Sequence, residues 1–414
     1  MKDASSIDSR GALSGIRVLD LSRVLAGPWA TQLLADYGAE VIKVERPGEG
    51  DDTRSWGPPW LKDSERNDTG DSAYFLSTNR NKRSLTANLA HPDGSRIVRD
   101  LARTCDIVVE NFKVGTLKRY GLDYDSLREL NPGLVYCSIS AYGQSGSRAD
   151  QPGYDAMIQA SGGLMSITGA ADEEGGTPQK TGVAIADIMA GMYATTAILA
   201  ALMARNELGE GQYIDVPLYD SQVAWLANQN MNYLVGGIVP GRQGTAHPNI
   251  APYQTFATAD GHVTLAVGND RQFRACMECL GLDDLSADTR FHNNASRVAN
   301  RRVLIALMAE KFSEQPASEW LQKLGAIGVP VGPINTIEDV FSEAYAEERE
   351  LVRQVNRDDT GDIPTVANPV RFSSTPVTYR DAPPRVGQHT DDILVSELGY
   401  TDEKIDALRQ AGAI

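Results

Sequence analysis

Apolar residues in the first third of the chain fall into short runs that alternate with helical periods. Residues 15–22 have the pattern of a strand, residues 28–38 that of a helix, and residues 40–45 that of a second strand. The order repeats, with one helix leading into a strand at 106–110 and another into a strand at 134–140. This alternation predicts a doubly wound α/β domain whose parallel sheet is covered on both faces. Its ligand should lie beyond the carboxyl ends of the strands.

The middle of the chain has a different pattern. Residues 253–268 alternate between apolar and polar around an Ala-Asp-Gly turn, which predicts an antiparallel hairpin, and helical periods follow it. A chain of 414 residues exceeds what one hydrophobic core usually supports, so we expect two domains. The predicted divisions are the first part of the large domain at 1–200, a linker at 201–224, a small α+β domain at 225–335, and a return linker with the C-terminal part of the large domain at 336–414.

The net charge of the chain indicates which kinds of molecule it does not bind. A net charge of -16 argues against nucleic acid or an anionic membrane surface, since an acidic field repels both. Residues 1–13 lack the apolar core of a signal peptide, and the apolar run at 193–204 is shorter than the about 20 residues that span a bilayer. We therefore expect a soluble protein of the cytoplasm, in which an anionic ligand must find a local basic patch.

The cysteines do not predict a metal site. Cys276 and Cys279 form a CxxC, but no second pair or flanking histidine completes a zinc site. Their surroundings have a helical pattern, which favours two buried helical thiols over zinc or redox chemistry. We predict no metal.

Basic residues gather in one block and at the ends of predicted strands. Arg80, Lys82 and Arg83 stand close together, and composition leaves open whether they bind phosphates or form a solvated turn. Arg46 follows the second strand, and Asn111 with Phe112 follows the strand at 106–110. Such strand ends suggest a nucleotide-like ligand, with cations for phosphates and a flat ring for a base. Neither GxGxxG nor GxxxxGK[ST] is present, which disfavours ordinary dinucleotide and P-loop chemistry.

Asp187 is the only charged residue between residues 181 and 204. It stands where a glycine-rich stretch gives way to an apolar helical run. A carboxylate at a helix N-terminus is favoured in its ionised form by the free amides there, and it can act as a covalent nucleophile. The alternative is a helix N-cap, a far commoner use of aspartate.

The chain resembles the class III CoA-transferases, the family of formyl-CoA transferase and carnitine CoA-transferase. Blocks that carry the likeness are LDLSRVLAGPWATQLLADYGAEVIKVERPGEGD, NRNKRSL, DIVVENF, PGYDAMIQASGGLMSITG, GVAIADIMAGMYATTAILAAL and GQHTDDILVSELGY. The resemblance implies a large Rossmann-like domain, a small domain and an interlocked homodimer. It makes Asp187 the nucleophile, which forms an aspartyl-acyl anhydride and then an aspartyl-CoA thioester. The segment around GTAHPNIAPYQTFATADGH is similar to the branch that uses succinyl-CoA and dicarboxylates such as glutarate.

The resemblance also implies the contacts with coenzyme A, which is a substrate and not a permanently bound cofactor. Formyl-CoA transferase has a glutamine where Leu25 stands and a run of glycines where this chain has GRQGTAHPN, so formyl or oxalate specificity is doubtful. Amides near Ala26 and Gly27 are candidates for an oxyanion hole. The implied CoA contacts are Val24, Leu25, Arg46, Asn111, Phe112, Arg119 and Tyr142.

Two alternatives and the acceptor site stay open. An α-methylacyl-CoA racemase shares the fold and the aspartate, but it needs a histidine where Tyr154 stands, and an ordinary tyrosine is a poor base at neutral pH. A non-catalytic CoA-binding protein would not need Asp187. A dicarboxylate acceptor requires a cation for its distal carboxylate, which Arg242 or His247 could supply, although both could equally be surface loop residues.

Overall fold

The computed structural model describes residues 11–414 and divides them into two compact units. The large unit comprises residues up to 164, 181–231 and 345–414, and the small unit comprises 165–180 and 232–344. A six-stranded sheet in which all neighbours run parallel forms the centre of the large unit, as predicted. Its strands, in spatial order, are β5 Lys82–Thr86, β2 Glu40–Glu45, β1 Arg17–Asp20, β6 Ile107–Glu110, β7 Val135–Ser140 and β8 Tyr213–Pro217.

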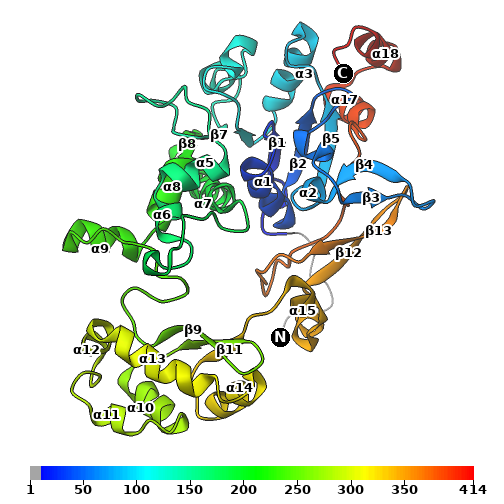
Figure 1. Ribbon diagram of the computed structural model, residues 1–414. Helices are drawn as coiled ribbons and strands as arrows, with labels where there is room; N and C mark the ends of the chain where they lie inside the picture. Colours follow the sequence, from blue (N-terminus) through cyan, green and yellow to red (C-terminus); the bar gives the residue numbers. More distant parts are fainter. Residues whose placement is uncertain (1–10) are drawn as a thin grey trace, which may run out of the picture. The chain divides into compact units, whose positions relative to one another are not determined.

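Strand alternation divides the interior of the large unit between two cores. Val18 and Val109 point to the face covered by α1 and α7, whereas Leu19 and Val108 point to the face covered by α3, α17 and α18 (Figure 1). The C-terminal helices contribute Ile393 and other buried side chains to the second core, so the tail packs onto the large unit as predicted. The helices that cover the sheet are α1 Ala26–Asp36, α3 Pro92–Ala102, α7 Ile185–Leu208, α17 Thr390–Leu398 and α18 Asp402–Gln410.

Shorter elements connect the strands of the large unit. A segment between β2 and β5 adds a small hairpin and a helix, and a second hairpin follows residue 351. The α-helices and strands are β3 Trp60–Lys62, β4 Asp68–Ser72, α2 Ala73–Leu76, α4 Tyr124–Arg128, α5 Asp155–Ser161, α8 Leu218–Trp225, β12 Val352–Arg357 and β13 Gly361–Val366, and the 3₁₀ helices are η1 Asp52–Ser55 and η2 Leu117–Tyr120. Three helices contain residues of both units, α6 Leu164–Ile167, α9 Asn228–Gly236 and α16 Ala344–Glu348.

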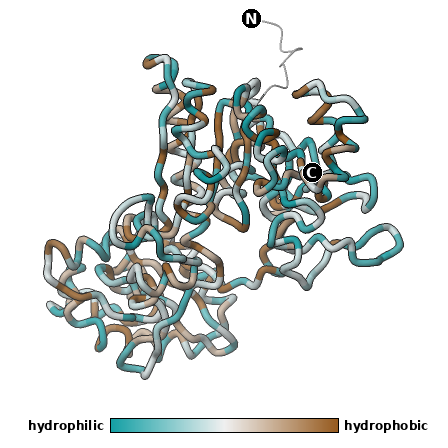
Figure 2. The backbone as a smooth tube through the Cα atoms, turned by 90° about the horizontal axis from the view of Figure 1, so that it is seen from above, coloured by the Kyte–Doolittle hydropathy of each residue, from teal (hydrophilic) through white to brown (hydrophobic). Residues whose placement is uncertain are grey.

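The small unit has a core and a sheet of its own. The predicted hairpin is present as β9 Tyr253–Ala257 and β10 His262–Ala266, to which β11 Val331–Pro333 adds a third antiparallel strand. Cys276 is buried on a helix and Cys279 is partly buried on it, as the helical pattern predicted. Figure 2 shows apolar segments all along the chain trace, consistent with a separate core in each unit. The remaining elements are η3 Asp172–Glu174, α10 Asp270–Cys279, α11 Asp284–Ala287, α12 Asn294–Ala299, α13 Arg301–Phe312, α14 Ala317–Ala326 and α15 Ile337–Ser342.

The predicted linker at 201–224 was wrong. This stretch contains the end of α7, strand β8 and most of α8, all of which belong to the large unit. The strand escaped notice because β8 lies at the edge of the sheet and buries only Val216 well, so its apolar signal is weak. Residues 165–180, which we assigned to the large domain, belong to the small unit.

The expectation that the apolar run is too short to span a bilayer was also wrong. The run forms part of α7, a helix of 24 residues whose length and composition alone would allow it to cross a membrane. Its residues Ala190, Ala194 and Ile198 are buried in the same core as strands β1, β6 and β7. We therefore assign α7 as a core helix of the large unit.

Close packing of α1 against α7 depends on Gly191. A Cβ atom added there would lie 2.7 Å from the Ala26 carbonyl oxygen and 3.1 Å from Cδ1 of Trp29. Because a backbone oxygen has little room to move, Gly191→Ala should lower the stability of the large unit by about 1–3 kcal/mol despite the better helix propensity of alanine. Thermal unfolding would measure this loss. Gly325→Ala on α14 is the matched control, since no atom lies within 4 Å of its added Cβ, and it should be neutral or stabilising.

Candidate active site

Asp187 is the third residue of α7. The helix is capped by Ala184, which makes no side-chain cap hydrogen bond, so the N-cap interpretation of Asp187 was wrong. The carboxylate instead lies in the first turn of α7, partly buried, beside a second carboxylate from α5. Its position leaves it available for chemistry.

Asp155 fixes the start of α7. Its Oδ1 accepts a hydrogen bond of 2.9 Å from the amide of Ala186, and its Oδ2 accepts one of 2.8 Å from Nε2 of Gln159. The Oε1 atom of the buried Gln159 accepts a 2.9 Å bond from the amide of Thr181, which ties the preceding loop to the same pair. Asp155 therefore accepts a hydrogen bond from one of the free amides at the N-terminus of α7, which is the role that the N-cap interpretation gave to Asp187.

The surroundings of Asp187 favour its neutral form. Burial raises the pKa of Asp187, and the negative charge of Asp155 raises it further, to about 7. We had expected free helix amides to hold the carboxylate ionised, and this expectation was wrong because Asp155 accepts from one of those amides and burial outweighs the rest. A carboxyl group that titrates near neutral pH in a partly buried position is typical of functional sites.

Tyr74 shares this environment. Burial raises the pKa of Tyr74 to about 12, with contributions from Asp187 and Asp155, so its hydroxyl stays protonated and can donate a hydrogen bond. Its ring meets that of Trp56 edge-on, with centroids 5.3 Å apart. Sequence reasoning missed Tyr74, because no local pattern shows that the segment between β2 and β5 approaches α7.

The loop between β1 and α1, residues 21–25, is called the substrate loop here. Val24 has a φ of 71°, a left-handed conformation that is a genuine outlier for a β-branched residue. Asn111 at the end of β6 accepts from the amide of Arg23 at 2.8 Å and donates to its carbonyl at 2.7 Å. Leu25 then caps α1 without a side-chain hydrogen bond. Asn111, at the end of a neighbouring strand, thus helps to hold the loop in a conformation that is unfavourable for Val24.

A cavity of about 310 Å³ lies beyond the carboxyl ends of β1, β2, β5 and β6. It brings together the predicted residues Arg46 and Phe112, and Arg23 lies over the Phe112 ring with its guanidinium carbon 5.5 Å from the centroid. Arg46 is largely exposed and forms an ion pair with Glu49 at 2.6 Å. Sequence reasoning missed other residues of its wall, although they follow predicted strands or the Asn-Phe motif: Asn88, Leu89, Ala90, Thr116 and Tyr120.

Five of the seven predicted CoA contacts do not line this cavity: Val24, Leu25 and Asn111, which form or hold the substrate loop, and Arg119 and Tyr142. Arg119 is exposed on η2, next to the cavity residue Tyr120. Tyr142 follows β7, where Arg148 covers its ring at 3.7 Å, and its hydroxyl oxygen lies 3.5 Å from Oγ of Ser161 on α5. Tyr142 therefore contacts the helix that carries Asp155, and not the cavity that contains Arg46.

Comparison with known proteins shows the family to which the chain belongs. The model of CoA-transferase family III matches residues 13–390. The chain belongs to this family. A solved CAIB/BAIF family protein from Brucella suis is 45% identical, with a TM-score of 0.81 over 94% of this chain and all of that chain. The resemblance found in the sequence is confirmed, and the chain is an enzyme of the CoA-transferase class.

Two relatives of this transferase have names that specify their substrates. Succinate–glutarate CoA-transferase of Agrobacterium fabrum is 48% identical over 92% of this chain and 94% of its own length. The human succinyl-CoA:glutarate CoA-transferase is 43% identical over 99% of this chain and 91% of its own length. The likeness to both therefore extends over nearly the whole chain.

Neither interpretation of the basic block in the transferase was correct. Arg80 is buried, with Nη2 2.5 Å from Oδ2 of Asp36, and Lys82 is buried, with Nζ 3.1 Å from Oδ2 of Asp20. The Nη1 atom of Arg83 lies 3.6 Å from Oε1 of Glu397. The first two cations serve internal ion pairs, so they form neither a phosphate site nor a solvated turn.

Arg242 and His247 of the transferase lie in the small unit and have partners there. Arg242 pairs with Asp172 and donates to the carbonyl of Gly176 at 3.2 Å. His247 stacks on Tyr253 with ring centroids 5.2 Å apart, and burial lowers its pKa. A role in acceptor binding would require Arg242 to share or exchange its partner.

Proposed function

We propose that this enzyme transfers CoA from succinyl-CoA to a dicarboxylic acid such as glutarate, with Asp187 as the covalent nucleophile. The names of its relatives support the substrate pair. The role of Asp187 rests on the position of its carboxyl group in the first turn of α7. Burial and the charge of Asp155 raise the pKa of this group. A carboxylate without a compensating cation attacks more readily than one held in an ion pair.

The proposed reaction is a sequence of acyl transfers. An Oδ atom of ionised Asp187 attacks the thioester carbon of succinyl-CoA, the C–S bond breaks, and CoA leaves as thiolate from a mixed anhydride. The thiolate attacks Cγ of Asp187 and releases succinate, which leaves an aspartyl-CoA thioester. The acceptor carboxylate attacks Cγ and displaces the thiolate, and the thiolate then attacks the acceptor's acyl carbon and restores Asp187. Covalent catalysis thereby divides one difficult exchange into easier steps.

We infer that the nucleotide end of CoA occupies the cavity beyond β1, β2, β5 and β6. Arg46 and Arg119 would bind phosphates, with Arg46 exchanging Glu49 for the ligand, and Phe112 offers a flat apolar surface to a ring. Val24 and Leu25 in the substrate loop would contact the pantetheine arm. The amides of Ala26 and Gly27 at the start of α1 would stabilise the oxyanion that forms at each attack. Asn111 would contribute by holding the backbone of Arg23 in the substrate loop. Tyr142 would contribute through its contact with α5, the helix that carries Asp155.

We further propose that the acceptor's distal carboxylate meets Arg242 or His247, and that the enzyme is a cytoplasmic homodimer. Large apolar side chains are exposed along several helices of the large unit, and removing apolar surface from water favours association between chains. A second copy would cover them, as in the interlocked dimer that the family resemblance implies. The residues concerned are Tyr154, Met157, Met192, Tyr193, Met203, Leu208, Trp225 and Met231.

An acceptor screen tests this function. Purified enzyme is mixed with succinyl-CoA and a panel of mono- and dicarboxylic acids, and new CoA esters are identified by mass. We expect glutaryl-CoA or the ester of a similar dicarboxylate. The absence of any ester, together with deuterium exchange next to the thioester of a branched acyl-CoA, would instead favour racemisation.

The pH profile should report the ionisation of Asp187. Because only ionised Asp187 attacks, kcat/KM of the free enzyme should rise with pH through about 7 and then level off. Asp155→Asn removes the neighbouring charge but not the burial, so the rise should shift to lower pH while staying above the range of an ordinary aspartate. The amide oxygen can still accept from the amide of Ala186, which preserves the helix start. An unchanged midpoint in Asp155→Asn would contradict this electrostatic coupling.

A further inference from the structure

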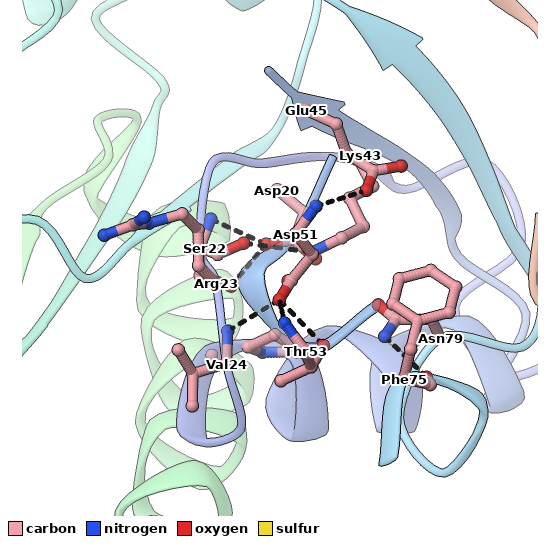
Figure 3. Close-up of polar contacts among 12 residues, drawn as sticks. Asp20, Ser22, Arg23, Val24, Lys43, Glu45, Asp51, Thr53, Phe75 and Asn79 are labelled. Carbon is pink, nitrogen blue, oxygen red and sulfur yellow. Dashed lines mark hydrogen bonds and ion pairs between the residues drawn. The ribbon is translucent and has the colours of Figure 1, made fainter. Parts of the chain in front are cut away.

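A buried ion pair lies beneath the substrate loop. Lys43 on β2 and Asp51 beyond it are fully buried, with Nζ 2.8 Å from Oδ2 (Figure 3). The same Nζ donates to the carbonyl of Ser22 at 3.0 Å, and Oδ1 of Asp51 accepts from the amide of Val24 at 3.3 Å. Each partner of the pair therefore binds the substrate loop directly, one residue on either side of Arg23.

The pair is fixed from below by other polar groups. The amide and the hydroxyl of Thr53 donate to Oδ1 of Asp51 at 3.0 and 2.8 Å, and the amide of Asp51 donates to Oε1 of Glu45 at 2.9 Å. Asp20 accepts from the amide of Ser22 at 2.9 Å and so holds the loop at its start (Figure 3). Polar groups thus support the middle of the loop, while Leu21 and Leu25 at its two ends are buried.

Stability alone does not explain this arrangement. A buried ion pair usually gains no more than well-packed apolar residues of the same volume would. A left-handed conformation at a β-branched residue such as Val24 costs about 1–3 kcal/mol and persists only where its surroundings over-determine it. Lys43 and Asp51 stabilise this loop conformation through hydrogen bonds with backbone atoms. Apolar side chains in their place could not form these bonds.

The pair should stay charged across the pH range in which the enzyme works. Burial alone would raise the pKa of Asp51, but Lys43 and Thr53 outweigh it and lower the value to about 2. Burial would lower the pKa of Lys43, but Asp51, Asp20 and Glu45 together raise it. Lys43 and Asp51 should therefore keep their mutual ion pair beneath the loop near neutral pH.

We propose that Lys43 and Asp51 are positioning residues for CoA transfer: they hold Val24 and Leu25, and with them the first amides of α1, where the thioester reacts. This inference rests on the proposed function. Neither residue reaches the reacting atoms, and each acts through the backbone of the loop. Loss of either should let Val24 relax to negative φ and move the amides away from the thioester.

The test compares isosteric variants with matched controls. Lys43→Met and Asp51→Asn remove the charge at nearly constant volume. Arg80→Met and Asp36→Asn do the same to the buried pair of Arg80 and Asp36, whose other hydrogen bonds go to Asn81, Asn368 and β13 and not to the loop. Each variant is assayed well below its own melting temperature for kcat and KM with succinyl-CoA. Equilibrium binding of adenosine 3′,5′-bisphosphate then measures how much of any loss comes from the nucleotide cavity, whose wall includes Lys43 and Asp51.

We expect Lys43→Met and Asp51→Asn to lose about 10²-fold in kcat/KM, the cost of a misplacement of about 1 Å, while both controls stay near wild type. Lys43 and Asp51 also line the nucleotide cavity, so their variants should bind adenosine 3′,5′-bisphosphate less tightly, but by much less than they lose in kcat/KM, while both controls bind it as the wild type does. The proposal is overturned if the two loop variants keep wild-type kcat/KM, or if their affinity for the bisphosphate falls as much as kcat/KM does, which would place the whole effect in the nucleotide cavity. Asp51→Asn carries the decision if Lys43→Met does not fold, since Asn can still accept from Thr53 but turns an NH2 group toward the ammonium of Lys43, which then loses its acceptor and its fixed position beneath Ser22. A wild-type enzyme without transfer activity would refute the proposed function instead, before any variant is compared.

Discussion

Asp187→Asn should abolish CoA transfer, with a loss in kcat of at least about 10³-fold, which is in the range seen when a covalent nucleophile is removed. The amide has the volume of the carboxyl group but cannot form the anhydride. Intact-protein mass after mixing with succinyl-CoA should show an added CoA or succinyl group on the wild type and none on the variant. Because burial disfavours the charged form of Asp187, the variant should be at least as stable as the wild type in thermal unfolding.

Asp215→Asn is the matched control for this experiment. Asp215 lies on β8 in the same unit, burial raises its pKa too, and its Oδ2 accepts from the amide of Gln144 at 2.9 Å. An amide at this position can keep that hydrogen bond, so activity and the mass adduct should persist. Full transfer activity in Asp187→Asn would remove Asp187 from the mechanism and revive the interpretation of a binding protein or of a different nucleophile.

The sequence predicted those elements whose signals are local. Strand β2 begins and ends at the predicted residues, and the hairpin of β9 and β10 follows from its alternation and its turn. Strand β8 and the hairpin of β12 and β13 were missed. They bury few side chains, and several of those are polar, so hydropathy does not distinguish them from loops.

Only part of the candidate site could be predicted, because several of its residues act on Asp187 from distant parts of the sequence. Asp187 stands out because a single charge in an apolar helix is visible locally. Asp155, which sets the start of α7 and raises the pKa of Asp187, acts across 31 residues of sequence. Tyr74 approaches Asp187 from an insertion after β2. The cavity residues Asn88 to Ala90 could have been found, since they follow β5 and ligands of such sheets lie at the strand ends.

The basic block shows how charge density can mislead. A cluster of arginine, lysine and asparagine looks the same in sequence whether it faces phosphate, water or a buried carboxylate. Here the deciding partners are Asp36 and Asp20, which lie 44 and 62 residues before the cations that they bind. Lys82 is fully buried, and burial lowers its pKa to about 8 although Asp20 partly offsets it, so this amine is not exposed to a ligand.

Arg80→Met should therefore lower the free energy of unfolding by about 3–5 kcal/mol, because it leaves Asp36 buried without its cation. Nε and Nη2 of Arg80 donate to both carboxylate oxygens, and Nη1 donates to Oγ1 of Thr365 at 3.0 Å, so the side chain also joins β13 to α1. Chemical denaturation followed by circular dichroism measures the loss, and exposed Lys62→Met, whose partner Asp68 is also exposed, should change little. The affinity for CoA should be unchanged in Arg80→Met measured below its transition. If Arg80 were instead a phosphate ligand, Arg80→Met would bind CoA more weakly and would keep the free energy of unfolding of the wild type.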